Sequence, residues 1–148
     1  MENNLSNIKK LLNDLEKYCT KKAKLYDVEN LAGPQGKVLY YLYKNKDKKI
    51  FVKDIEKKFD MTKSVTSNLL KRMEKNNFIE IIPSKKDRRY KQVVLTSYAE
   101  NKIPNLLLFT ADVHSVLGKD ISKDDWLITK KVLKQLAENI SKEENSDV

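Results

Sequence analysis

Two short segments of this chain, on either side of a basic turn, limit what it can fold into. Residues 78–82 alternate apolar side chains with Glu80, and residues 91–95 are rich in valine, so both are predicted to be strands. The polar residues between them would close a single hairpin. Elsewhere apolar residues recur at helical spacing, and the 148 residues include only 3 Gly and 3 Pro, which argues against a many-turned β sandwich. The predicted fold class is mainly α with a small β-hairpin.

Apolar residues three and four positions apart predict six helices. They cover residues 5–26, 34–43, 54–59, 62–76 and 96–117, with a last one from residue 123. Thr62 and Ser122 precede two of these helices and are suitable N-caps. The first helix carries a wider apolar face than one small core needs, so we expect it to require a partner surface.

Length and residue usage predict one cytoplasmic domain. A chain of 148 residues is the size of a single domain. One cysteine excludes an internal disulfide framework and favours a reducing compartment. No apolar run approaches the ~20 residues of a membrane span, and the first residues lack the order of a signal peptide. We therefore expect no membrane association.

Positive charge is concentrated in the middle of the chain. Residues 34–98 hold 17 Lys and Arg against 7 Asp and Glu, whereas the whole chain has 30 against 21 and a net charge of +9. The flanks together are therefore close to neutral. A basic excess confined to one segment predicts a surface for a polyanion such as nucleic acid.

The order helix, short helix, turn, helix, hairpin is that of a winged helix-turn-helix. In residues 62–76, Val65, Leu69 and Met73 would form the buried face. The opposite face would then carry small or basic groups suited to base edges and phosphates in a major groove, namely Lys63, Ser64, Ser67, Asn68 and Lys71.

The predicted hairpin loop strengthens this interpretation. Residues 84–90 place four cations around one acid, Asp87, and such density suits a narrow, electronegative minor groove. Asp87 lies two positions before Arg89, so the two side chains can pair and fix the direction of the guanidinium. Arg88 would then project to the other side, toward phosphate.

Three segments resemble the multiple antibiotic resistance regulator (MarR) family. Residues 31–39 (LAGPQGKVL) resemble the opening of its second helix, residues 61–74 (MTKSVTSNLLKRME) its recognition helix, and residues 87–89 with 94–96 its wing and the start of its fifth helix. The chain departs from the family pattern at Asn77, where a glycine is common, and at Ser67, where an arginine is frequent.

The resemblance implies a homodimeric transcriptional regulator, usually a repressor, with one domain over residues 1–148. Residues 1–31 and 99–148 would form the dimerisation region, and residues 34–98 the DNA-binding region. Recognition helices of residues 62–76 would enter successive major grooves of a pseudo-palindromic double-stranded operator, and the wing, residues 83–91, the minor groove. The predicted DNA-contacting residues are Thr62, Lys63, Ser64, Thr66, Ser67, Asn68, Lys71, Lys85, Lys86, Asp87, Arg88 and Arg89.

The resemblance also implies a small aromatic or phenolic effector that releases the DNA. Tyr18, Tyr26 and Tyr40 are candidate pocket residues, although aromatic residues on helices more often belong to a core. His114 is expected to be a surface or interface residue. No cofactor and no metal are expected; zinc sensing in particular is disfavoured, because one His and one Cys leave only carboxylates to complete a site.

Three other functions stay open at this point. Cys19 could make the chain a redox-sensing regulator, although a packed thiol is usually inert. A winged helix can also bind protein without binding DNA. A nuclease would need clustered carboxylates, and Asp54 and Glu56 point in different directions on one helix, so we expect no enzyme.

Overall fold

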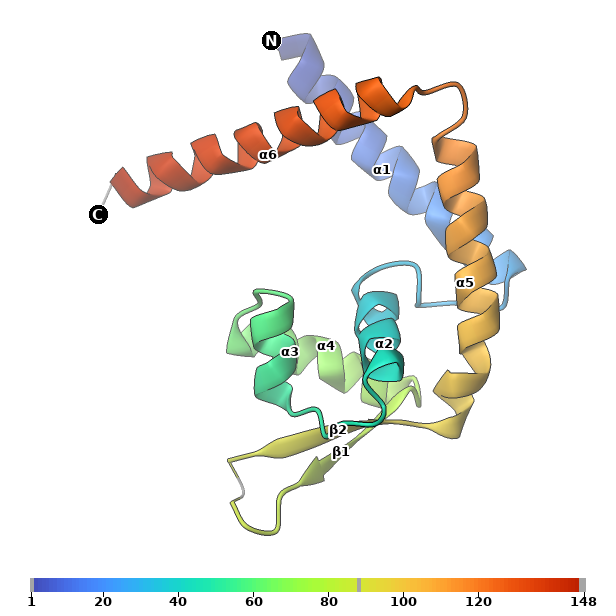
Figure 1. The fold of residues 1–148 in the computed structure, drawn as a ribbon, viewed down its shortest axis with the longest axis vertical. Coiled ribbons are helices and arrows are strands. Elements are labelled where there is room, and N and C mark those ends of the chain that lie inside the picture. The colour runs from blue at the N-terminus through green and yellow to red at the C-terminus, as the bar shows by residue number, and fades with distance from the viewer. Residues whose placement is uncertain (1, 88, 147–148) are drawn as a thin grey trace. The chain divides into compact units, whose positions relative to one another are not determined.

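A computed structural model describes residues 2–87 and 89–146 (Figure 1). The elements run in the order α1 (Glu2–Leu25), α2 (Pro34–Lys44), α3 (Val52–Lys58), α4 (Lys63–Lys75), β1 (Ile79–Pro83), β2 (Lys91–Leu95), α5 (Ser97–Leu117) and α6 (Lys123–Ser146). This confirms a mainly helical fold with a small hairpin. The chain forms two compact units, residues 1–113 and residues 114–148.

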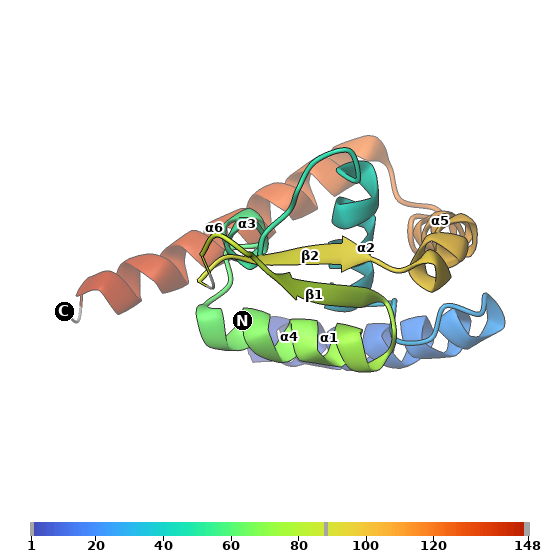
Figure 2. The same cartoon turned by 90° about the horizontal axis from the view of Figure 1, so that it is seen from below.

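The hairpin pairs β1 with β2 in antiparallel register, with Ile79 opposite Leu95 and Pro83 opposite Lys91. Figure 2 shows its turn at the end away from the start of α5. The segment before α3 adds a short bridge, because Phe51 pairs with Gln92 and the Val93 N–H donates to the Ile50 carbonyl at 2.8 Å. The hairpin is thereby attached to the residues that lead into α3.

The third helix begins two residues earlier than predicted. The Asp54 carboxylate accepts a hydrogen bond from the Phe51 N–H at 2.8 Å, so the chain turns into the helix at Val52. The predicted start at Asp54 was wrong because Ile50, Phe51 and Val52 read as one β-prone segment. A carboxylate at the third helical position satisfies a free N–H at the helix start.

The core of the first unit lies among α2, α3, α4, the hairpin and one side of α5. Leu39, Ile55, Met73 and Ala99 are fully buried in it. From α1, only the C-terminal part reaches this core, with Ala23 buried and Cys19 packed against it. Farther toward the N-terminus, Leu5, Leu11 and Leu12 are exposed, so much of the broad apolar face of α1 has no cover within this unit.

Polar contacts join the end of α1 to α5 within the first unit. The Asp112 carboxylate accepts hydrogen bonds from Lys22 Nζ at 2.8 Å and from the Tyr26 hydroxyl at 2.7 Å. Lys102 Nζ donates to the carbonyl and the carboxylate of Asp27, both at 2.9 Å. We call the Lys22, Tyr26 and Asp112 group the α1–α5 clamp.

Two positions show how the backbone turns at the start of α2 and after α4. A Cβ on Gly36 would overlap the carbonyl oxygen of Leu31, so only glycine lets α2 begin against this backbone. Asn77 has a φ of 64°, which asparagine tolerates better than most residues, and it ends α4 as predicted.

The second unit consists of the end of α5 and the helix α6. Ser122 caps α6, since its Oγ accepts a hydrogen bond from the Asp125 N–H at 3.1 Å. None of the described residues of α6 is buried, and its exposed apolar residues include Trp126, Ile128, Leu133 and Ile140. Among the described residues, no helix is long and apolar enough to cross a membrane.

Candidate nucleic-acid interface

The helix α4 begins as the sequence predicts. Thr62 adopts an extended backbone, and its hydroxyl accepts a hydrogen bond from the Val65 N–H at 3.2 Å. This cap satisfies one of the free N–H groups at the helix start and leaves others directed outward. Free N–H groups and the positive end of the helix dipole favour a phosphate at this position.

The buried face of α4 differs from the predicted one. Thr66, Leu69, Leu70 and Met73 are buried, while Val65 is 53% exposed. The prediction that Val65 packs in the core was therefore wrong. Thr66 is fully buried and its hydroxyl donates to the Thr62 carbonyl at 2.8 Å, so this residue cannot contact DNA as predicted. Leu69 and Met73 are buried as predicted, so the buried face is only displaced from Val65 toward Thr66 and Leu70.

The other predicted residues of α4 lie on its exposed surface. They are Lys63, Ser64, Ser67, Asn68 and Lys71, and Thr62 before them is exposed as well. Val65 joins this surface as a candidate that sequence reasoning missed. The signal was present, because Thr66, Leu69, Leu70 and Met73 follow the i, i+3, i+4, i+7 pattern of a buried stripe.

In the hairpin loop, Asp87 and Arg89 form the predicted pair. Arg89 Nη2 donates to Asp87 Oδ2 at 2.8 Å, and Arg89 Nε lies 3.1 Å from both carboxylate oxygens. The Arg89 N–H also donates to Asp87 Oδ1 at 3.0 Å. The Arg89 side chain remains 84% exposed, so the guanidinium is oriented and still accessible.

The electrostatics of this pair follow from the same contacts. Hydrogen bonds from the Arg89 side chain and backbone lower the pKa of the Asp87 carboxyl, and Lys53 lowers it further. The same pairing raises the pKa of the Arg89 guanidinium. Asp87 is therefore charged at neutral pH and available to hold Arg89.

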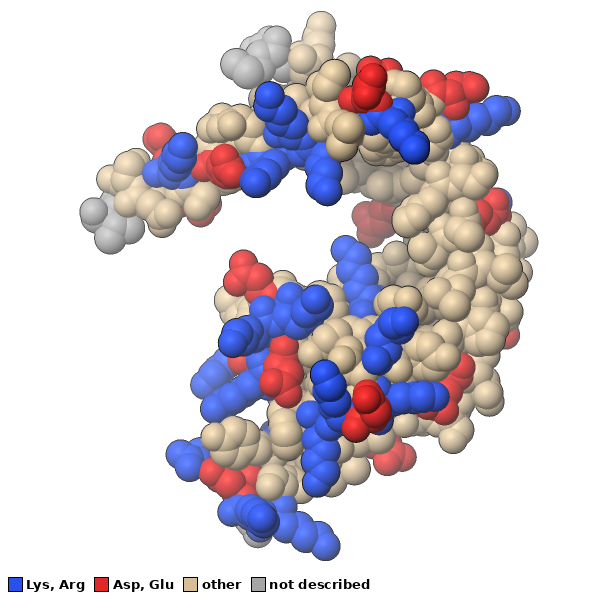
Figure 3. Space-filling model, in the orientation of Figure 1, with Lys and Arg blue, Asp and Glu red and all other residues tan. Residues whose placement is uncertain are grey.

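Further cations surround the loop. Lys85 and Lys86 are exposed, whereas Arg88, for which a phosphate contact is predicted, lies outside the described residues. In the view of Figure 3, Lys and Arg side chains gather over α3 and the hairpin, with some acidic side chains among them. This face carries the positive charge that the middle of the sequence predicts.

The three candidate effector tyrosines stand in different surroundings. Tyr18 and Tyr26 lie near Lys22 and the α1–α5 clamp, and Tyr40 is exposed on α2. The Tyr26 hydroxyl is occupied by Asp112, which raises its pKa, while the Tyr18 hydroxyl is buried without a partner among the described residues. A hollow of about 480 Å³ lies elsewhere, between α1, the start of α2 and α4, and is lined by Leu15, Cys19, Gln35, Leu69 and Arg72 among others.

Cys19 and His114 are the residues considered for redox and metal chemistry. Cys19 is partly buried, and this burial raises the pKa of its thiol, which disfavours the reactive thiolate. His114 is exposed on α5. Among the described residues, no three His, Cys, Asp or Glu side chains gather as a metal site would require.

Comparison with known proteins finds one family model that matches part of this chain and solved structures that match most of it. The MarR family model matches residues 29–89, which include α2, α4 and part of the wing. The heme sensor protein PefR from Streptococcus agalactiae, solved in complex with heme, is 47% identical over 94% of this chain and 95% of its own, with a TM-score of 0.79.

Two further relatives are transcription regulators. The transcription regulator MarR from Oenococcus oeni PSU-1 is 28% identical over 90% of this chain and 98% of its own, with a TM-score of 0.66. The HTH-type transcriptional regulator BilQ of Clostridioides difficile (strain CD3) is 25% identical over 109 residues, or 74% of this chain and 70% of BilQ. With its winged helix and these relatives, the chain belongs to the MarR family of DNA-binding transcription regulators.

Proposed function

We propose that this protein is a homodimeric repressor that binds a pseudo-palindromic operator and is released by an effector. The observation that carries the proposal is the Arg89 guanidinium, which Asp87 holds in a fixed direction although it is 84% exposed. An exposed ion pair contributes little to folding stability. A preoriented arginine at a hairpin tip is well suited to a narrow minor groove.

In this proposal, α4 reads the major groove. The exposed Ser64, Ser67 and Asn68 supply hydroxyl and amide groups for base edges. Val65 supplies an apolar surface that fits a thymine methyl group. Lys63, Lys71 and the N-terminus of α4 would meet phosphates, with Thr62 positioning that N-terminus.

Dimerisation rests on apolar surface that each unit leaves uncovered. The first unit exposes Leu5, Leu11 and Leu12 on α1, and the second unit exposes apolar residues along α6. Uncovered apolar area of this kind favours association with a second copy. Two copies related by a twofold axis would read half-sites about one helical turn apart, roughly 34 Å.

Fluorescence anisotropy with two duplexes tests the proposed DNA binding. The duplexes are the region upstream of the protein's own gene and a shuffled control, each titrated at two salt concentrations. We expect salt-sensitive binding that prefers the upstream region. Arg89→Ala should weaken binding by roughly five- to 150-fold, the cost of losing one well-formed groove contact.

Lys130→Ala is the matched control, because it removes an exposed cation from α6. It should leave the affinity within twofold. Equal, weak binding to both duplexes by the unaltered protein would refute sequence-specific regulation. That result would favour the protein-binding alternative.

Heme is the effector that one relative suggests, because PefR is a heme sensor protein and was solved with heme. The chain contains one histidine, His114, and an imidazole is a common axial ligand of heme iron. His114 is exposed on α5, and Leu117, three positions on and on the same side of the helix, is an exposed apolar residue that a porphyrin could cover. These residues fit one axial position, so we propose His114 as a heme ligand, a role beyond the surface position expected from sequence.

A hemin titration followed by the Soret band tests this role. The unaltered chain should show a shifted, saturable band, His114→Ala should lose or alter it, and Cys19→Ser should keep it. Hemin should also release the upstream duplex from the unaltered protein. A Soret band that is identical in His114→Ala would contradict the assignment and return a small phenolic effector as the better candidate.

A further inference from the structure

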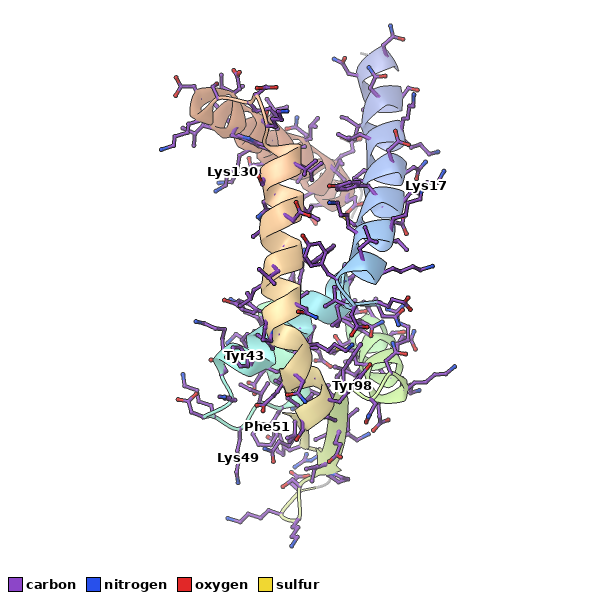
Figure 4. The ribbon with its side chains drawn as sticks, turned by 90° about the vertical axis from the view of Figure 1, so that its right-hand side faces the viewer. Lys17, Tyr43, Lys49, Phe51, Tyr98 and Lys130 are labelled. Atoms are coloured by element: carbon purple, nitrogen blue, oxygen red, sulfur yellow. The ribbon has the colours of Figure 1, made fainter. Side chains whose placement is uncertain are left out.

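Tyr90 stands at the base of the wing with partners from another element. Its ring meets the ring of Phe51 edge to face, with centroids 6.2 Å apart and an interplanar angle of 73°. Lys53 Nζ lies 4.9 Å from the centroid of the same ring. Phe51 caps α3 and Lys53 lies in its first turn, and Figure 4 shows Phe51 beside the hairpin. The side chain of Tyr90 is therefore docked on the start of α3.

The backbone of Tyr90 closes the loop that carries Arg89. Its N–H donates to the Asp87 carbonyl at 3.0 Å, and its carbonyl accepts from the Ser84 N–H at 2.8 Å. The Asp87–Arg89 pair therefore lies inside a loop whose closing residue is also the one that is anchored. A displacement of the Tyr90 backbone would therefore displace the adjoining Arg89 as well.

The helix α3 is a suitable anchor because it also supports α4. It packs against both α4 and β2. The turn between α3 and α4 is short and passes through Asp60, whose φ is 50°. Fixing the wing to α3 therefore fixes the wing relative to the recognition helix.

We propose that Tyr90 is a positioning residue of the DNA-binding surface: its ring, held by Phe51 and Lys53, sets where Arg89 stands relative to α4. An aromatic ring suits this task, because edge-to-face packing and a cation over the ring both have defined geometry. Tyr90 is 43% exposed, so core packing does not account for it. The packing of Tyr90 on Phe51 and Lys53, which we call the brace, does not depend on the function proposed above, whereas the DNA part of this inference rests on it.

The first test measures the brace without DNA. Backbone ¹⁵N relaxation of Lys86, Asp87 and Arg89 reports the order of the wing. In the unaltered protein we expect order parameters of about 0.85, falling toward about 0.6 in Tyr90→Ala and recovering in Tyr90→Phe, which keeps the ring. Unchanged order parameters in Tyr90→Ala would overturn the proposal.

Tyr98→Ala is a matched control. Tyr98 is 46% exposed, stacks on Phe78 at a centroid distance of 6.0 Å and has Lys102 Nζ 5.2 Å from its ring. Like Tyr90, it is a partly exposed ring that packs on another aromatic ring and has a lysine near its face, but it lies in the first turn of α5. Tyr98→Ala should leave the order of the wing unchanged, and an equal loss of order would show that the effect is general destabilisation.

The second test uses the upstream duplex and a double-mutant cycle. Tyr90→Ala should weaken binding about five- to tenfold through loss of preorganisation, and Tyr90→Phe should stay within twofold. In an Arg89→Ala background, Tyr90→Ala should add less than twofold, because it acts through Arg89. An equal loss in both backgrounds would overturn the positioning role.

The two tests separate the inference from the proposed function. If the unaltered protein does not prefer the upstream duplex, the proposed function and the DNA part of this inference fail together, and relaxation alone decides the brace. If Arg89→Ala weakens binding but Tyr90→Ala does not, the proposed function stands and the positioning role of Tyr90 is refuted.

Discussion

At the residue scale, the charge on Asp87 has two opposite effects on a polyanion. The carboxylate orients Arg89, and it also repels phosphate. Its lowered pKa means that the pair forms above the usual carboxyl range and is lost only as pH falls through that lowered value. The pair is therefore intact throughout the neutral range.

Asp87→Asn separates these two effects. It removes a negative charge, so binding to the shuffled duplex should rise slightly. It also weakens the hold on Arg89, so the ratio of upstream to shuffled affinity should fall, by about fivefold. Anisotropy with both duplexes measures the ratio, and an unchanged ratio would show that Asp87 does not orient Arg89 for recognition.

Val65 and Thr66 make the exposed face of α4 testable one residue at a time. Thr66→Val should cost about 1 kcal/mol of unfolding free energy, because the buried hydroxyl loses its bond to Thr62, and should leave DNA preference unchanged. Val65→Ala should leave the free energy of unfolding nearly unchanged and should reduce the preference for the upstream duplex. Chemical unfolding and duplex titrations check the two substitutions, and a loss of DNA preference in a stably folded Thr66→Val would contradict the burial of Thr66.

At the element scale, the α1–α5 clamp links α1 to α5. Lys22 first and Tyr26 second lower the pKa of Asp112 through hydrogen bonds, while Asp112 raises the pKa of Lys22. The stability from Asp112 is therefore present above the ordinary carboxyl pKa of 3.8 and is lost as pH falls through the lowered value. The contribution of Lys22 is lost only as pH rises through its own raised pKa, above 10.5.

Asp112→Asn should accordingly lower the free energy of unfolding by a constant amount over the neutral range. The difference from the unaltered protein should shrink in acid, below about pH 4. Urea unfolding at several pH values measures it, with Asp14→Asn on the exposed side of α1 as the control. A difference that persists undiminished at pH 3 would show that the charge of Asp112 is not the cause.

The start of α2 depends on one glycine. Gly36→Ala places a Cβ against the Leu31 carbonyl, and a backbone atom cannot move aside as a side chain can. We expect a loss of about 1–3 kcal/mol, in the range of overpacked core sites. Thermal unfolding checks it, with Gly33→Ala as the control because nothing lies near a Cβ there. Equal stability of the two variants would contradict the close packing.

At the scale of the whole molecule, the exposed apolar residues of α6 carry the dimer proposal. Leu133→Glu places a charge among them and should give a monomer that no longer prefers the upstream duplex, because a single half-site binds weakly. Sedimentation equilibrium measures the mass, and Lys134→Glu is the neighbouring control. If Leu133→Glu is still a dimer, the dimer interface does not include this part of α6.

Much of the local structure was predictable because it depends on neighbours in sequence. The caps at Thr62 and Ser122 act within three residues, and Asp87 pairs with Arg89 two positions away. Asn77 reverses the chain through its own backbone preference. Each contact is available to the isolated segment, so composition and spacing were sufficient to predict it.

Tertiary structure alone decided which groups from distant segments meet. Asp112 binds Lys22 and Tyr26 across 90 and 86 positions, and Phe51 receives Tyr90, a contact that no periodicity indicates. The buried stripe of α4 could instead have been recognised from helical spacing, although only packing shows that Thr66 takes a core position while Val65 is exposed. The sequence by itself determined the helices, the wing and its paired arginine, whereas packing decided the faces they present.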